Sequence, residues 1–461
     1  MNNDSLGNDS INSLIVKFSV PSIIAMVVNA IYNIVDRIFI GEFVGETALA
    51  SLIVVFPIMM ILFAVLILTG LGGANLISIS LGRGCKEDAN KYFTSMIVLS
   101  LVFSIITAFF IFMFMENILT YLGAKGEVLE YGLTYLGIYL YFTPFSALSF
   151  ALSSSVRAEG FPKLSMNALI VSALTNIVLD YIFIKYFHMG VAGGALATGI
   201  GQTVGVIIFL SHYVRKKGIL SFDFKNIIPK AKTIQEIVVI GTPAFFTNLG
   251  ISVSSMFLNS SLNLYGGVEA VTAMSAINSL FTIIIMPING IQGGVSPIIG
   301  YNHGAKKRSR VKETLAKALI IGISFSCIAF VLIQGAPKLL LSLFIDSGSN
   351  TINGAVIGLR LFMLCLPLLS VSVMSIGYFQ ATQKPKVAIV LGLLRQFILL
   401  IPLLYFLPKE FGLIGVWASV PISDAIAIAI SALMIAIDFK QNKEKDTPSE
   451  VKEYIKYVDA N

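Results

Sequence analysis

The stretch FSVPSIIAMVVNAIYNI, residues 18–34, has a near-copy in IGTPAFFTNLGISVSSM, residues 240–256. Both stretches are almost wholly apolar, and each carries a proline at the same place, Pro21 in the first and Pro243 in the second. Apolar runs of this kind are typical of helices that cross a bilayer, which needs ~20 residues. The pair therefore predicts a membrane protein built from two similar halves.

Three further pairs of segments extend the repeat along the chain. They are LGGANLISISLGRGCKEDANK (71–91) with IQGGVSPIIGYNHGAKKRSRV (291–311), VRAEGFPKLSM (156–166) with FQATQKPKVAI (379–389), and HMGVAGGALATG (188–199) with EFGLIGVWASVP (410–421). Because each copy has an even number of predicted helices, both copies start on the same side of the membrane. Such a parallel repeat, related by an axis along the membrane normal, is typical of secondary transporters with a site between their halves.

The composition supports this class. Of the 461 residues 56% are hydrophobic and 12% are charged, and the mean hydropathy is +0.86, whereas a soluble domain carries about 25% charged residues. The alternating pattern of a membrane β-barrel is absent from the sequence. We expect an all-α integral membrane protein with twelve transmembrane helices in two six-helix lobes. The predicted spans are 13–40, 47–81, 92–115, 131–155, 164–184, 190–213, 234–260, 270–302, 314–334, 355–380, 387–407 and 412–437.

The same pattern predicts the organisation of the chain. We expect an N-terminal lobe over 13–213, a basic inter-lobe linker over 214–233, a C-terminal lobe over 234–438 and a tail over 439–461. The second and eighth spans are longer than a membrane needs and contain proline and glycine, which predicts tilts or kinks there. These residues are Pro57, Gly70, Gly72, Gly73, Pro287, Gly290, Gly293 and Gly294.

Basic residues mark one side of this topology. Most of the 32 lysines and arginines fall in the linker, in alternate loops and in the tail. The positive-inside rule then places both termini in the cytoplasm of a multi-pass cell-membrane protein. The net charge of +7 is explained by this topology, so we expect no nucleic-acid partner. The polar N-terminus lacks the basic region of a cleavable signal peptide.

The sequence speaks against several other functions. The three cysteines and three histidines show no metal-ligand spacing, and no nucleophile–base pattern suggests an enzyme. The phosphate-binding motif G-x-x-x-x-G-K-[ST] does not occur. We therefore expect neither a metal nor a bound cofactor, and transport would have to draw on an ion gradient. A two-lobe repeat also favours a site that alternates between the two sides over an open channel.

Two aspartates lie in predicted membrane spans. Asp36 follows Asn33 by three positions in the first span, and Asp180 follows Asn176 by four positions in the fifth. An ionisable group at this depth costs ~2.5–3.5 kcal/mol and commonly marks an ion or proton path. Both aspartates are predicted near the outer ends of their helices. Two carboxylates with amides at one depth could hold a proton or a small cation, because close carboxylates repel when both are ionised. The alternative is a structural hydrogen bond.

The repeat confines this site to one lobe. Asp36 corresponds to a position near Leu258, and Asp180 to one near Leu403. Since neither leucine can bind a cation, the coupling site is expected in the N-terminal lobe alone.

Other polar residues lie deep in predicted helices. Arg395 and Asp424 lie near the middles of the eleventh and twelfth spans. A buried ion pair that fixes the C-terminal lobe is the interpretation we favour, and a substrate or gating role is the alternative. Thr198 and Gln202 in the sixth span could line the interior of the N-terminal lobe, or could form hydrogen bonds between helices.

Together these features resemble the multidrug and toxic compound extrusion (MATE) family. The resemblance rests on the six-plus-six repeat, the aspartate in the first span and N-x-x-x-D in the fifth. The stretches RAEGFP (157–162), QATQKP (380–385) and LLRQFILLIP (393–402) look most like its DinF- and MepA-type bacterial branch. The resemblance covers nearly the whole chain.

The resemblance implies a V-shaped cavity between the lobes and export of bulky, often cationic, drugs against H⁺ or Na⁺ by a monomer in the bilayer. It assigns the cation or proton cluster to Asp36, Asn176, Asp180 and Thr198. From the sequence itself we expect Asn33 and Gln202 to be further cavity-lining residues. Another branch uses carboxylates in the seventh and tenth spans. Here the seventh has only Glu236, at its start, so no cation site is expected in the C-terminal lobe. A lipid or cell-wall precursor flippase of related fold is the alternative function.

Overall fold

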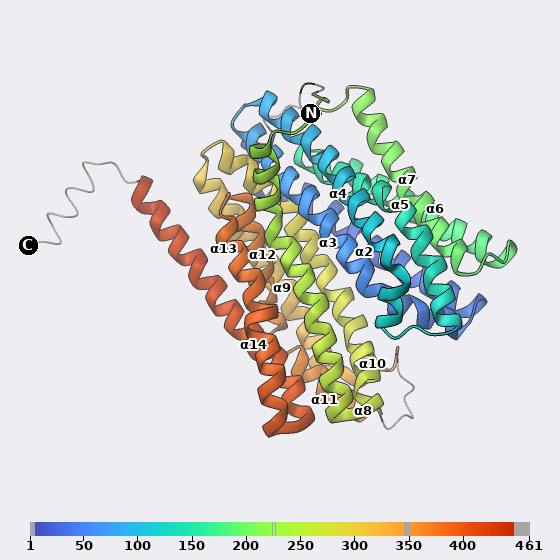
Figure 1. The fold of residues 1–461 in the computed structure, drawn as a ribbon. Coiled ribbons are helices and arrows are strands. Elements are labelled where there is room, and N and C mark those ends of the chain that lie inside the picture. Colours follow the sequence, from blue (N-terminus) through green and yellow to red (C-terminus); the bar gives the residue numbers. More distant parts are fainter. Residues whose placement is uncertain (1–4, 224, 226, 345–350, 447–461) are drawn as a thin grey trace, which may run out of the picture.

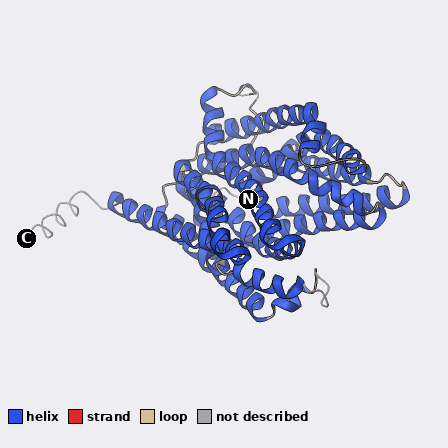
Figure 2. Ribbon diagram, turned by 60° about the horizontal axis from the view of Figure 1, so that its bottom comes forward, coloured by secondary structure: helices blue, strands red, loops and turns tan. Residues whose placement is uncertain are grey.

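The structure is a computed structural model that describes residues 5–223, 225, 227–344 and 351–446. The regular elements of these residues are helices (Figure 1, Figure 2). A short helix α1 (Ser5–Asn8) precedes the N-terminal lobe. That lobe contains α2 (Ile11–Phe43), α3 (Glu46–Gly82), α4 (Lys86–Tyr121), α5 (Glu127–Ala158), α6 (Pro162–Asp180) with its π-helical turn η1 (Tyr181–Tyr186), and α7 (Val191–Val214).

The C-terminal lobe follows after the linker. It contains α8 (Ala231–Gly304), α9 (Arg308–Gly335), α10 (Pro337–Leu341), α11 (Thr351–Phe362), α12 (Leu366–Ala381) and α13 (Pro385–Leu393). Helix α13 continues through the π-helical turn η3 (Leu394–Leu400) into α14 (Ile401–Asp446). The predicted lobe boundaries remain predictions. The predicted tail begins at 439, but α14 continues to Asp446, and residues 447–461 lie outside the described part.

The described helices make twelve crossings, as the sequence predicts. Nine helices are long and apolar enough to cross a membrane, and α11 with α12, bent by 49°, makes a tenth crossing. Two of the nine contain a break, at Gly267 in α8 and at Gly412 in α14, where the backbone leaves the helical region. Each of these two therefore supplies two crossings. Most of the helices extend a few residues beyond the predicted spans, because their polar ends stay helical outside the apolar stretch.

The repeat is visible in the backbone angles. Gly45 and Gly267 have φ of 116° and 63°, and Gly190 and Gly412 have φ of 58° and 57°. The members of each pair stand 222 positions apart. Glycine adopts positive φ without a steric penalty, so it is favoured at such turns. The two lobes therefore reverse the chain at equivalent places.

The lobes meet along α2 and α3 on one side and α8 on the other. A Cβ on Gly72 would collide with the Ile237 carbonyl, and a Cβ on Gly82 would collide with that of Tyr301. Small residues let membrane helices approach to backbone contact. α3 is one helix from Glu46 to Gly82, so these glycines provide a contact surface for the other lobe.

Hydrogen bonds also join the lobes, and they lie at one end of the bundle. Ser296 Oγ donates to Asn75 Oδ1 at 2.9 Å. Tyr92 donates to Glu236 Oε2 at 2.6 Å, and Arg83 to Gln383 Oε1 at 2.8 Å. This is the end where α7 stops and α8 starts, which we call the linker end; the opposite end is the far end. Glu236, near the start of α8, thus takes part in the contact between the lobes.

Two adjacent glycines on α8 test whether close approach holds the lobes together. A Cβ on Gly294 would lie 2.7 Å from the Ser19 Cα of α2, whereas a Cβ on Gly293 meets nothing within 4 Å. We expect Gly294→Ala to destabilise the protein by about 1–3 kcal/mol, because the backbone of α2 must move. Gly293→Ala should be neutral or slightly stabilising, since alanine favours the helix. Thermal unfolding in detergent measures both, and equal melting temperatures would contradict the interpretation.

Candidate cation site

Asp36 lies on α2, about two turns before its far end. Its side chain is buried, with 7% of the residue exposed, and its Oδ1 has no hydrogen-bond partner among the described residues. The neighbouring Arg37 guanidinium lies over the Phe56 ring at 5.5 Å, as expected for adjacent residues whose side chains diverge on a helix. Asp36 therefore presents an unpaired carboxylate oxygen to the lobe interior.

Asp180 and Asn176 lie one turn apart on α6. Asp180 is fully buried, and neither of its carboxylate oxygens has a partner in the described part of the chain. Asn176, 2% exposed, donates from Nδ2 to Thr198 Oγ1 at 3.2 Å, which leaves its own Oδ1 without a donor. The i,i+4 spacing that the sequence shows thus places both groups on one buried face.

Small residues on α7 bring these helices together. An added Cβ on Gly194 would lie 3.0 Å from Asp36 Oδ1, and one on Gly201 would lie 3.2 Å from the Asn176 Cβ. Directly after Asp180 the helix widens into η1, and π-helical turns often occur at functional sites. The polar groups of α2 and α6 therefore lie against the same helix, which also carries Thr198.

The structure adds Tyr135 of α5, which the sequence did not single out. Its side chain is buried and lies within electrostatic range of both Asp36 and Asp180. Those two carboxylates also lie within electrostatic range of one another. Tyr135 lies in a segment rich in tyrosine, so its sequence holds no signal that separates it from its neighbours.

The two further predicted residues lie differently. Asn33 is exposed and donates to the Asn29 carbonyl of its own helix at 2.7 Å, so the structure does not bring it into the cluster. Gln202 is half-buried and interacts with the Tyr32 hydroxyl. Their predicted role as cavity-lining residues remains a prediction.

The cluster is rich in acceptors and poor in donors. Asp36 Oδ1, Asn176 Oδ1 and both carboxylate oxygens of Asp180 are buried without a hydrogen-bond partner among the described residues. Leaving a buried acceptor unsatisfied costs free energy, and more when it is charged. Carboxylate, amide and hydroxyl oxygens suit a hard cation. The arrangement can therefore bind a proton or a small cation.

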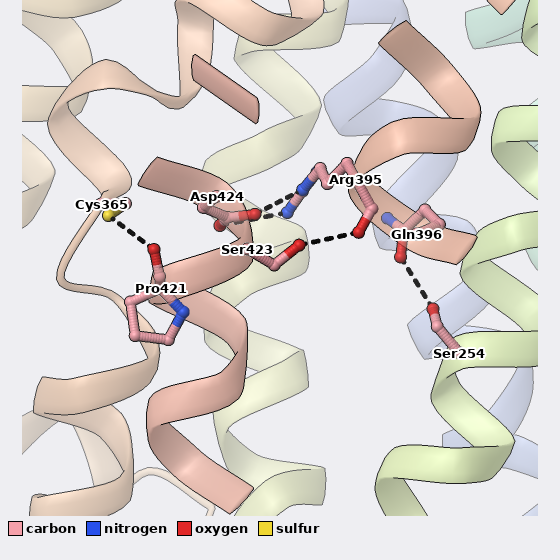
Figure 3. A network of polar contacts seen from close by, with 7 residues as sticks. All are labelled: Ser254, Cys365, Arg395, Gln396, Pro421, Ser423 and Asp424. Atoms are coloured by element: carbon pink, nitrogen blue, oxygen red, sulfur yellow. Dashed lines mark hydrogen bonds and ion pairs between the residues drawn. The ribbon is translucent and has the colours of Figure 1, made fainter. Parts of the chain in front are cut away.

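The charged residues of the C-terminal lobe lie in a different environment. Arg395 on η3 donates from Nε to Asp424 Oδ1 at 2.5 Å and from Nη2 to Asp424 Oδ2 at 3.3 Å (Figure 3). The side chains are 22% and 8% exposed. The sequence predicts this ion pair, and the two-point contact satisfies both carboxylate oxygens.

Neighbouring polar groups surround the pair. Ser423 Oγ donates to the Arg395 carbonyl at 2.7 Å, and Ser254 Oγ donates to Gln396 Oε1 at 2.7 Å (Figure 3). The Cys365 thiol, at the bend between α11 and α12, contacts the Pro421 carbonyl at 3.2 Å. Hydrogen bonds around the pair thus join η3 to α8 and to α14, and the bend before α12 to α14.

We expect the ion pair to show non-additive effects on stability. Arg395→Leu should cost about 3–5 kcal/mol, because it leaves the Asp424 charge buried and unpaired. The double variant Arg395→Leu with Asp424→Leu should cost less than either single change. Unfolding in detergent gives the coupling energy. A double variant that loses as much as the two single variants combined would contradict the pairing.

Known proteins are similar in sequence to this chain over almost its full length. A multidrug export protein MepA from Staphylococcus haemolyticus is 31% identical over 95% of this chain and 96% of its own length. A multidrug export protein MepA from Staphylococcus aureus strain NCTC 8325 is 29% identical over 93% of this chain and 94% of its own.

Solved structures share the fold. A structure described as the outward-facing conformation of a multidrug resistance MATE family transporter superposes with a TM-score of 0.90 at 23% identity, covering 96% of this chain and 99% of that one. A transporter of the MOP superfamily from Pyrococcus furiosus gives a TM-score of 0.91 at 23% identity, with the same coverage. The MatE family matches residues 21–182 and 243–406, once in each half. The chain belongs to the MatE family.

Proposed function

We propose that this protein is a secondary active multidrug exporter that moves bulky, often cationic, compounds out of the cell in exchange for H⁺ or Na⁺. The export activity follows its relatives, which are named multidrug export proteins. The observation that carries the coupling is the cluster of buried, unpartnered oxygens on Asp36, Asn176 and Asp180.

A bound cation would offset the cost of this cluster. Two carboxylates within electrostatic range repel when both are ionised, so a proton on one of them, or Na⁺ between them, stabilises the arrangement. Asn176 Oδ1 and the Thr198 hydroxyl would complete the set of oxygens around Na⁺. The Thr198 hydroxyl already accepts from Asn176 Nδ2, which turns the Asn176 oxygen away from that contact.

Helix α2 connects this site to the contact between the lobes. It carries Asp36 toward its far end and contacts α8 through Ser19 and Ile23 toward its linker end. At 1.5 Å per residue these contacts lie roughly 20–25 Å from Asp36 along one helix. A cation that changes how Asp36 packs on α7 would tilt α2, and Pro21 offers a place where the helix can bend. This is how cation exchange would change the access of the cavity.

Membrane orientation follows from the basic residues. We propose a cell-membrane location with the linker end, and both termini, in the cytoplasm. The inter-lobe contacts at the linker end would then close the cytoplasmic side. The protein would act as a monomeric transporter in the bilayer, with drugs as its partners, without nucleic acid, and not as an enzyme. Its buried carboxylates favour cationic cargo over the anionic headgroups that a flippase handles.

Removing the ionisable groups tests the coupling. Asp36→Asn and Asp180→Asn keep the shape of the side chain, and each should abolish drug efflux driven by an imposed gradient. Asp88→Asn, the same change at an exposed position on α4, is the matched control and should keep the parent rate. Efflux of a fluorescent cation from proteoliposomes is the measurement. Wild-type rates in both site variants would show that these aspartates are structural.

The coupling ion is identified by applying the two gradients separately. A pH gradient without Na⁺, and a Na⁺ gradient at equal pH, should differ in their effect on efflux from vesicles containing the unmodified protein. If the folded protein shows no efflux under either gradient, ion coupling is contradicted, while the fold is unaffected.

A further inference from the structure

The segment before α2 is held by the opposite lobe. Residues 5–10, the N-terminal hook, contain α1 and the N-cap Ser10. The hook leads into the N-terminal lobe, where Lys17 of α2 pairs with Asp9 at 3.9 Å, but the side chains that form hydrogen bonds to it belong to α8, α9 and the turn between them. Asn302 donates to the Leu6 carbonyl at 3.1 Å, and Arg310 donates to the carbonyls of Leu6 at 3.3 Å and Asp9 at 2.7 Å.

Lys307 adds two more contacts. Its Nζ donates to the Gly7 carbonyl at 2.8 Å and to Asn8 Oδ1 at 3.2 Å. Bonds from a charged donor are about twice as strong as neutral ones. The hook thus supplies acceptors, and the C-terminal lobe supplies the charged donors.

The hook fits a prepared site. Leu6 is 3% exposed, and an added Cβ on Gly7 would lie 3.1 Å from Tyr301 Cε1. Asn302 is fully buried and fixes Arg310 by accepting from its Nε at 2.9 Å. A hydrogen bond within the C-terminal lobe therefore orients two of the three donors, Asn302 and Arg310, toward the hook.

The linker behaves differently, although it lies at the same end. Leu220 N–H donates to Glu159 Oε1 at 2.6 Å, and Ser221 N–H donates to Asn90 Oδ1 at 2.9 Å. Both acceptors belong to the N-terminal lobe, to which this part of the linker is already joined. These bonds survive a separation of the lobes, whereas those of the hook cannot.

We propose that the N-terminal hook is a latch that holds the linker ends of the two lobes together, and that it must release the C-terminal lobe before the cavity opens at that end. The inference rests on the proposed function only in that the linker end opens during transport. Ser10, the last residue of the hook, has extended backbone angles of −60° and 141° and joins the hook directly to α2. When α2 tilts, the hook either follows it and loses the bonds from Asn302, Lys307 and Arg310, or stays and resists the tilt.

A reporter between the lobes measures release directly. Ser78 of α3 is 1% exposed, and its Cβ lies 3.1 Å from an added Cβ on Gly300 of α8. In a full-length chain with Cys85, Cys327 and Cys365 changed to alanine, Ser78→Cys should react with N-ethylmaleimide only when the lobes separate at the linker end. The rate of this reaction in proteoliposomes needs neither drug nor gradient, so failure of export would not affect the result.

Three changes and one control variant then examine the hook. Deleting residues 2–9 should raise the labelling rate about tenfold or more, because five hydrogen bonds are lost. Lys307→Met should raise it about threefold, since one donor group is lost. Lys307→Arg keeps a charged donor and should restore slow labelling. Lys306→Met removes a charge from the same turn at an exposed position and should leave the rate unchanged.

The outcomes are separable. If the deletion variant fails to fold, Lys307→Met decides, because it changes a single, exposed side chain. Labelling at the parent rate in folded deletion and Lys307→Met variants would overturn the proposal and make the hook a simple end to α2. Equal acceleration by Lys306→Met and Lys307→Met would also overturn it, since the effect would then come from charge and not from the latch.

Discussion

A carboxylate inside a membrane protein must find a positive partner or lose its charge, and this requirement separates the two lobes. Asp424 meets it within the protein, through two bonds from Arg395. Asp36 and Asp180 do not, because their buried oxygens have no donor in the described part of the chain. The same backbone plan thus yields one lobe whose buried carboxylate is paired within the protein and one whose buried carboxylate oxygens have no donor among the described residues.

The unpaired carboxylates of the N-terminal lobe can affect transport only if a change at them alters the contact between the lobes. Helix α2 provides the link, because one continuous element carries Asp36, the Ser19 contact with Gly294, and the hook at its start. The contact itself is made of glycines against backbone, as with Gly72 and Gly82, and such surfaces fit in one register and tolerate little sliding. A continuous helix and a close contact together favour two discrete arrangements of the lobes over a continuous range.

Much of this could be predicted from the sequence, for a physical reason. Membrane spans need long apolar runs, and turns with positive φ favour glycine. The twelve crossings and the paired glycines Gly190 and Gly412 can therefore be recognised from the local sequence. Buried charge is also visible, because it is expensive wherever it occurs; the Arg395–Asp424 pair was predicted on that ground.

What could not be predicted depends on packing between distant segments. Tyr135 looks like any other tyrosine of its helix, and the acceptors of the hook are backbone carbonyls, which every residue has. The glycines of α3 and α8 were visible, but they predicted kinks or tilts, and their contact with the other lobe appears only when the helices are assembled.

The repeat also shows how equivalent positions can diverge. In the N-terminal lobe Ser172 Oγ donates to the Gly201 carbonyl at 2.7 Å, joining α6 to α7. At the equivalent crossing of the C-terminal lobe the direction is reversed, because Ser423 donates to the Arg395 carbonyl at 2.7 Å. Both bonds hold two helices together at the same place, so either direction serves the fold. With the crossing secured in both lobes, the neighbouring side chains are free to differ: Gln202 stands where Asp424 stands in the second copy. The fold therefore fixes where two helices meet, while the side chains beside that meeting point are set separately in each lobe.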